Sequence, residues 1–234
     1  MVTIGGIKIA DIGFYINLDK RQDRKKKIEE QLVDFKISGV NRYSAFNEYD
    51  SNTLNCKRSH FNLMEKLLDS DFETILILED DCLFLDFFKT EYKSIIEDIN
   101  KTDWDVFWLG CRNRRPTKDY KNNCLNVSSV SYAQSYILKR NVCEFILNNF
   151  NNDDFYKQPV TPDELLCLAP YGKDVVLNPN NYNFYDLEQP LDNLPTFFKS
   201  LCYKKPLTTQ YSSFSDLWNT NVNYEEHIKG GYPK

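Results

Sequence analysis

The run Thr74-Ile75-Leu76-Ile77-Leu78 limits the fold of this 234-residue chain more than any other segment does. A continuous apolar run is typical of a central strand that is buried on both faces of its sheet, and such strands belong mainly to α/β proteins. Three acidic residues, Glu79-Asp80-Asp81, follow the run directly. Ligands of open α/β sheets bind outside the carboxyl ends of the strands. The pattern therefore predicts an α/β domain with an acidic site at one edge of its sheet.

Strand and helix patterns alternate along most of the chain. The predicted strands are 14–18, 40–46, 74–78, 105–110, 131–138 and 174–177, and the predicted helices are 19–35, 55–68, 92–99, 141–150 and one that opens at Thr161. This alternation favours a largely parallel sheet flanked by helices. Residues 178–234 are rich in Asn, Pro, Tyr and Phe and show little periodicity, so we expect ordered loops that wrap one domain spanning residues 1–234.

Composition excludes several classes of protein. Hydrophobic residues make up 41% of the chain and aromatic residues 15%, which is enough for a full core and argues against a disordered protein. The net charge of −5 argues against bulk electrostatic binding to nucleic acid. The 7 cysteines are odd in number and form no Cys-x-x-Cys pair, so we expect reduced, mostly buried thiols and neither a disulfide frame nor a zinc site. Without a signal-like start or a long apolar stretch, the sequence favours a cytoplasmic protein that has no membrane anchor.

The acidic trio is the sharpest chemical signal. Three adjacent carboxylates repel one another unless a cation or a hydrogen-bond network compensates their charge. Hard oxygen ligands of this kind suit Mn²⁺ or Mg²⁺, with a substrate diphosphate completing the shell. The alternative is the start of a solvated loop, which is less natural because the apolar segment Cys82-Leu83-Phe84-Leu85 follows.

The first predicted helix begins with a basic segment. Arg21, Arg24 and Lys25 have the i, i+3, i+4 spacing that places side chains on one helix face. Guanidinium groups at a helix N-terminus are suited to a diphosphate. The alternative is a solvated surface helix, which is the usual meaning of a charge run.

The segment Thr161-Pro162-Asp163-Glu164 has the pattern of a capping box, with Pro at the first helical position. Glu164 then has a structural role, whereas Asp163 is free to face a cleft and to act as a general base. His60, a lone helical histidine, is more often structural than a ligand. His227 either folds back as a metal ligand or hangs free near the end of the chain.

Six motifs in the same order resemble those of glycosyltransferase family 25, which includes lipopolysaccharide-type sugar transferases and collagen β-galactosyltransferases. The motifs are the opening run Phe14 to Arg24, the pair Ser59-His60, the strand Ile75 to Asp81, the strand Tyr132 to Leu138, the acidic segment Pro162 to Leu166, and Gln210 with Ser213 to Leu217. Each motif alone is weak, but the set spans most of the chain.

The resemblance implies a GT-A fold, a Mn²⁺ or Mg²⁺ ion, and inverting transfer of a hexose from a nucleoside-diphosphate sugar to a hydroxyl of a glycan or protein. UDP-galactose and UDP-glucose are the favoured donors. Asp163 would be the base, with Glu164 as a second catalytic candidate, and the metal candidates are Asp81, Asp80 and His227. The donor-binding candidates are Asn17, Leu18, Arg21, Arg24, Ser59, His60, Glu79, Asp80, Gly110, Gln134, Ser215 and Asp216.

Two alternatives remain open at this point. A metal-dependent phosphohydrolase or nuclease could also use Glu79-Asp80-Asp81, although such enzymes usually need more scattered carboxylates or His ligands, and this chain has only 2 His. The other alternative is a GT-A-shaped binding module that has lost its activity.

Overall fold

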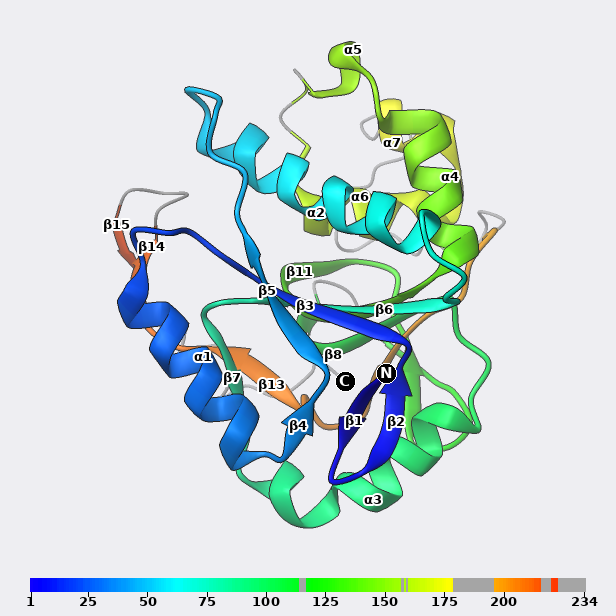
Figure 1. The fold of residues 1–234 in the computed structure, drawn as a ribbon. Coiled ribbons are helices and arrows are strands. Elements are labelled where there is room, and N and C mark those ends of the chain that lie inside the picture. The colour runs from blue at the N-terminus through cyan, green and yellow to red at the C-terminus, as the bar shows by residue number, and fades with distance from the viewer. Residues whose placement is uncertain (114–116, 157, 159, 179–195, 216–219, 223–234) are drawn as a thin grey trace.

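The computed structural model describes residues 1–113, 117–156, 158, 160–178, 196–215 and 220–222. Its centre is a twisted sheet with helices on both faces (Figure 1). The strands of this sheet lie in the order β5-β3-β6-β11-β8-β12-β10-β9. Their bounds are β3 Ile12–Asn17, β5 Val40–Ser44, β6 Thr74–Glu79, β8 Val106–Asn113, β9 Lys118–Asp119, β10 Cys124–Asn126, β11 Val130–Lys139 and β12 Ser200–Tyr203.

Most strands of the central sheet run in one direction. Strand β3 pairs in parallel with β5 and β6, and β12 pairs in parallel with β8. Strand β11 lies between β6 and β8 and is antiparallel to both. The prediction of an α/β domain with a mostly parallel sheet is confirmed, and the carboxyl ends of β3, β6 and β8 meet at one edge.

Strand β6 explains why its sequence does not alternate. Ile75 and Ile77 pack into the hydrophobic cluster on one face of the sheet, whereas Leu76 and Leu78 pack into the cluster on the other face. All four side chains are at most 1% exposed. Burying each contributes about 1.5–3 kcal/mol relative to exposure, so the strand is held firmly up to the residue where the carboxylates begin.

The helices form one layer on each face of the sheet (Figure 1). One layer contains α1 (Gln22–Asp34) and α3 (Phe87–Asn100), whose buried side chains pack together in one cluster. The other layer contains α2 (Asn52–Leu68), α4 (Arg140–Phe150), α5 (Asp153–Tyr156), α6 (Pro162–Leu168), the 3₁₀ helix η1 (Ala169–Tyr171) and α7 (Lys173–Leu177). The predicted helices are confirmed, with ends that differ by a few residues.

The predicted strand at 174–177 is wrong, because this segment belongs to helix α7. Gly172 has a φ of +99°, which L-residues rarely adopt, and it turns the chain directly from η1 into α7. Val175 and Val176 then bury their side chains in the same cluster as α2 and α4. A short apolar run does not distinguish a strand from one turn of buried helix.

The first residues form a hairpin that the sequence analysis does not predict. Strands β1 (Val2–Ile4) and β2 (Ile7–Ala10) are antiparallel, and β4 (Ile37–Ser38) pairs with the other edge of β1. Gly5 and Gly6 between the strands have φ values of +54° and +86°. Two positive φ angles are what a tight two-residue hairpin turn requires.

The chain after residue 178 contributes strands as well as loops. Strand β12 lies in the central sheet between β8 and β10, β13 (Thr208–Gln210) pairs with β7 (Cys82–Phe84), and β14 (Ser213–Ser215) pairs with β15 (Thr220–Val222). The expectation of loops alone does not anticipate β12. Among the helices that the structure describes, none combines the length and the apolar character that crossing a bilayer would need.

Candidate functional site

A cleft of about 370 Å³ lies where β6 ends. This volume falls in the range of about 300–1,000 Å³ that is typical of ligand sites. The predicted site residues that line it are Leu18, Arg24, Ser59, His60, Glu79, Asp80, Asp81, Asp163, Glu164 and Ser215. The fold therefore brings together residues that are distant in sequence, on the strand edge where the acidic trio was expected.

Asp80 is fully hydrogen-bonded within the protein. Its Oδ1 accepts a hydrogen bond from Arg24 Nη1 at 2.9 Å, and its Oδ2 accepts one from Asn17 Nδ2 at 2.7 Å. Asn17 is held in turn by Arg42, whose Nε donates to Asn17 Oδ1 at 2.9 Å. Asp80 is only 6% exposed, and burial raises its pKa although the contacts with Arg24 and Asn17 act in the opposite direction.

Asp81 is less well compensated. Its Oδ2 shares the Arg24 guanidinium at 3.2 Å, and its Oδ1 accepts from Gln210 Nε2 at 3.3 Å. Burial, and then the neighbouring charge of Glu79, raise the pKa of Asp81 above its usual range. One guanidinium therefore faces more negative charge than it can balance.

Arg24 pairs with Asp80 and Asp81, whereas Arg21 pairs with Asp23. The coulombic attraction of Asp81 and Asp80 raises the pKa of Arg24, although burial acts in the opposite direction. Arg21 instead pairs with the exposed Asp23 and lies outside the cleft lining. The predicted basic face is thus divided, and Arg24 serves the carboxylates directly.

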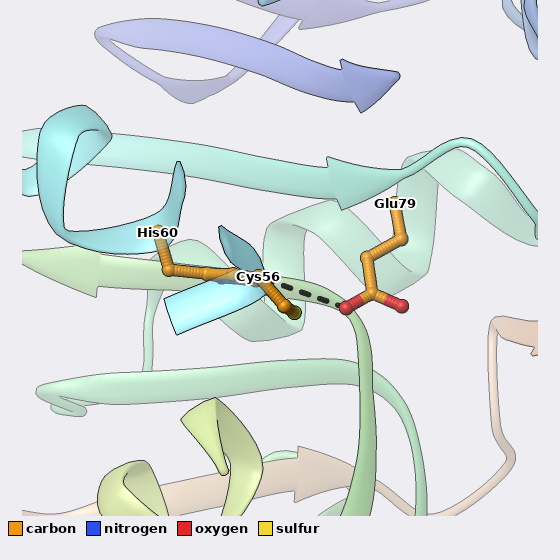
Figure 2. Close-up of side chains that lie close together, drawn as sticks. All are labelled: Cys56, His60 and Glu79. Atoms are coloured by element: carbon orange, nitrogen blue, oxygen red, sulfur yellow. Dashed lines mark ion pairs between the residues drawn. The ribbon is translucent and has the colours of Figure 1, made fainter. Parts of the chain in front are cut away.

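Glu79 faces a different group of side chains, shown in Figure 2. Cys56 Sγ, a ring nitrogen of His60 and a carboxylate oxygen of Glu79 all lie within 4.8 Å of one another. His60 Nε2 is 3.4 Å from Glu79 Oε1, and His60 Nδ1 is hydrogen-bonded to the Tyr136 hydroxyl. Burial and the charge of Glu79 raise the pKa of Cys56 well above its usual value.

The cysteine prediction is confirmed for most of the thiols. All seven cysteines are free, and six of them are buried. Cys56 is the exception, because it is partly exposed and lines the cleft. The composition of the chain gave no indication that Cys56 differs from the other cysteines. The signal that could have done so is its position four residues before His60, which puts both side chains on one face of a helix.

Asp163 is fixed at another wall of the cleft. Its Oδ2 accepts a hydrogen bond from the Tyr132 backbone N–H at 3.1 Å, and its Oδ1 accepts one from the Thr161 hydroxyl. Tyr132 has a φ of +73°, an unusual angle for a residue with a large side chain. The predicted capping box is confirmed, since the Thr161 N–H donates to Glu164 Oε2 at 3.0 Å.

Comparison with known proteins identifies the family. The model of glycosyltransferase family 25, described as an LPS biosynthesis protein, matches residues 40–165, which is more than half of the chain. The chain belongs to glycosyltransferase family 25. The matched segment carries Glu79-Asp80-Asp81, Tyr132 and Asp163, so the family resemblance and the cleft rest on the same residues.

Relatives of family 25 include proteins whose names describe them as active and as inactive. Mouse procollagen galactosyltransferase 2 is 28% identical over 151 residues, which cover 51% of this chain and 24% of the relative. The human inactive glycosyltransferase 25 family member 3 is 25% identical over 134 residues, covering 45% of this chain and 22% of the relative. The chain thus spans about a quarter of the length of these relatives.

One solved structure matches most of this chain at low sequence identity. A glycosyltransferase involved in glycosylation of the major capsid of PBCV-1 has a TM-score of 0.45 and 11% identity, and the match covers 94% of this chain and 89% of that one.

Four residues predicted to bind a donor in this family 25 chain lie outside the cleft lining: Asn17, Arg21, Gly110 and Gln134. Asn17 still contacts the site through Asp80. Packing requires glycine at position 110, because a Cβ there would lie 2.1 Å from the Thr208 carbonyl oxygen. Gln134 is buried at 2% exposure. Asp216 and His227 lie outside the described residues.

The cleft fits a hard divalent cation. Glu79 and Asp81 both line it, and Gln210 Nε2 lies between them, 3.5 Å from Glu79 Oε2 and 3.3 Å from Asp81 Oδ1. Burial, and then the charge of Glu79, raise the pKa of Asp81, and a bound cation would favour its charged form. Carboxylate oxygens are the ligands that Mg²⁺ and Mn²⁺ prefer.

Proposed function

We propose that this chain is a metal-dependent inverting glycosyltransferase with a GT-A fold. It would move a hexose from a nucleoside-diphosphate sugar to a hydroxyl of a glycan or protein acceptor. The observation that carries the proposal is one cleft that combines the undercompensated carboxylates Glu79 and Asp81 with a separately positioned carboxylate, Asp163. Membership of family 25 supports it. The galactosyltransferase names of several relatives make UDP-galactose the first donor to test, ahead of UDP-glucose.

The acidic end of the cleft suits the donor. Asp81 and Glu79 would hold Mn²⁺ or Mg²⁺, which when bound neutralises charge on the leaving diphosphate. Asp80 is committed to Asn17 and Arg24, so we assign it a positioning role beside the ion. Its hydrogen bonds fix the turn that follows β6, and this turn sets where the Asp81 carboxylate lies.

Asp163 suits the acceptor. Inverting transfer in one step needs a single base that takes the proton from the attacking hydroxyl. The Tyr132 N–H and the Thr161 hydroxyl hold the two carboxylate oxygens of Asp163 in place. A fixed carboxylate can accept the proton at the moment of attack without first reorganising. Glu164 is occupied in the capping box, so we assign it a structural role.

Donor binding is the first test. A ligand that binds only the folded state raises the melting temperature. We expect a shift with one class among UDP-, GDP-, TDP- and CMP-sugars in Mn²⁺, and no shift when EDTA replaces the metal. If no donor shifts the transition, the proposal fails, and phosphatase and nuclease assays would then test the hydrolase alternative.

Substitution of the base is the second test. Asp163→Asn keeps the size of the side chain but cannot take up the proton, so we expect kcat to fall by about 10²–10⁴-fold while the donor-induced melting shift remains. Glu164→Gln is the matched control, because Gln also completes a capping box, and it should retain most of the rate. A larger loss in Glu164→Gln than in Asp163→Asn would move the base to Glu164.

An inactive module is the second candidate function. Similarity to a human relative that is named inactive favours it to a limited degree. Such a module would show the metal-dependent donor shift without turnover of any donor. Cytoplasmic location and the absence of nucleic-acid binding stay predictions from composition.

A further inference from the structure

Three different ligand types meet beside the carboxylate site. Cys56 and His60 are separated by one turn of α2, and Glu79 is the last residue of β6. Their Sγ, nitrogen and oxygen atoms lie within 4.8 Å of one another (Figure 2). All three residues line the cleft, so a small solute can reach the group from solvent.

His60 lacks the hydrogen bond that its burial would normally demand. The side chain is 1% exposed, and among the described residues its Nε2 makes no hydrogen bond. Glu79 Oε1 is 3.4 Å away but is not aligned for one. Buried polar atoms are rarely left without partners, so each one calls for an explanation.

The other nitrogen of the His60 ring is fixed. His60 Nδ1 is hydrogen-bonded to the hydroxyl of Tyr136, a fully buried residue of β11. Histidines that bind metals use one ring nitrogen for the ion and hold the ring in place through the other. The Tyr136 contact therefore orients His60 with Nε2 toward Glu79.

We propose that Cys56, His60 and Glu79 form a site for a thiophilic divalent cation such as Zn²⁺. Tetrahedral zinc places its ligand atoms about 3.5 Å apart. Side-chain rotations that move each ligand atom by about 1 Å would therefore bring the three atoms into contact with one ion. The Cys56 thiol gives its proton to solvent as the Zn–S bond forms. Three protein ligands leave a fourth position that opens into the cleft.

The mixed sulfur, nitrogen and oxygen set distinguishes this site from the oxygen site at Asp81. Glu79 belongs to both sites, with Oε1 toward His60 and Oε2 toward Gln210. Thiolate and imidazole favour zinc, whereas carboxylates favour Mg²⁺ and Mn²⁺. Binding at Cys56 needs neither donor nor acceptor, so the proposal does not rest on the proposed function. A chain without transferase activity would still bind the ion.

Co²⁺ is the probe, because a cobalt–thiolate bond gives a charge-transfer absorption band in the near ultraviolet. We expect the wild-type protein to show this band with one equivalent of Co²⁺ and to lose it when Zn²⁺ displaces the cobalt. Cys56→Ser should abolish the band and weaken Zn²⁺ binding by at least about tenfold. Cys124→Ser, a buried cysteine on β10, is the control that should keep both.

Three results would overturn the proposal: no thiolate band in the wild-type protein, equal Zn²⁺ affinity in wild type and Cys56→Ser, or loss of the band in Cys124→Ser. The first uses no variant, so it holds even if a substitution impairs folding. His60→Gln provides a second variant, and we expect it to weaken Zn²⁺ binding while leaving the Cys56 thiol in place.

Discussion

Glu79 and Asp80 are neighbours in sequence, yet their carboxylates have opposite surroundings. Both oxygens of Asp80 accept short hydrogen bonds, from Arg24 and Asn17. Among the described residues, the oxygens of Glu79 have a 3.5 Å contact with Gln210 and a His60 nitrogen at 3.4 Å that is not aligned for a hydrogen bond. Where β6 ends, successive side chains turn to opposite sides. The described residues give Asp80 two short hydrogen bonds and give Glu79 one long contact.

Removing the Arg24 guanidinium should have the largest effect on the free energy of unfolding. Arg24→Met removes the guanidinium that pairs with both Asp80 and Asp81. Because two buried carboxylates lose their partner, we expect the free energy of unfolding in urea to fall by about 3–5 kcal/mol. Lys26→Met is the matched control on the same helix, and its exposed pair with Glu30 should contribute about 0–1 kcal/mol. Equal losses in the two variants would contradict the comparison.

Removing the charge of Asp81 should increase the stability of the metal-free protein. Asp81→Asn removes a carboxylate charge that burial, and then the charge of Glu79, disfavours, and it keeps the side-chain shape. In EDTA we expect a gain of about 1 kcal/mol, seen as a melting temperature higher by about 2–4 °C. The same variant should lose the Mn²⁺-dependent shift with donor. Glu97→Gln, exposed on α3, should change neither value, and a less stable Asp81→Asn protein would contradict the repulsion argument.

Lys57 is a buried charged group outside the cleft, and it is tested through the pH dependence of stability. It follows Cys56 on α2 but points away from the cleft, and its Nζ donates to the Gln158 carbonyl oxygen at 2.8 Å. Burial lowers the pKa of Lys57 to about 8, from 10.5. Between these values the unfolded chain binds more protons than the folded chain does, so stability relative to Lys57→Met should rise with pH from about 8 to 10.5.

The measurement is the difference in unfolding free energy between wild type and Lys57→Met across that pH range. The difference should be flat below pH 8, where Lys57 is protonated in both states. Lys66→Met, at an exposed position of the same helix, is the control and should give no slope. A difference that falls between pH 8 and 10.5 would show that Lys57 is better stabilised as a charged group.

The sequence predicted the features that depend on residues close to one another in the chain. The apolar run 74–78, the acidic trio after it and the Thr161 capping box all appear as expected. Contacts between residues that are distant in the sequence could not be predicted in the same way. Nothing in the sequence links Arg24 to Asp80, because only the parallel pairing of β3 with β6 brings α1 to the end of β6.

The missed elements are short. Strand β12 has four residues, and its place depends on pairing with β8 and β10 rather than on its own pattern. The Gly5-Gly6 turn was a readable hairpin signal that the sequence analysis did not use. The reversal of 174–177 from strand to helix shows that a few apolar residues take the conformation that their neighbours impose.

The place of β12 also has a consequence for biosynthesis. Residues 200–203 join the sheet between β8, which ends at residue 113, and β10, which ends at residue 126. The facing edges of these two strands therefore stay unpaired until most of the chain has been synthesised. Unpaired strand edges are templates for association between chains. A nascent chain that pauses before residue 200 would therefore expose the edges of β8 and β10 that β12 covers in the folded protein.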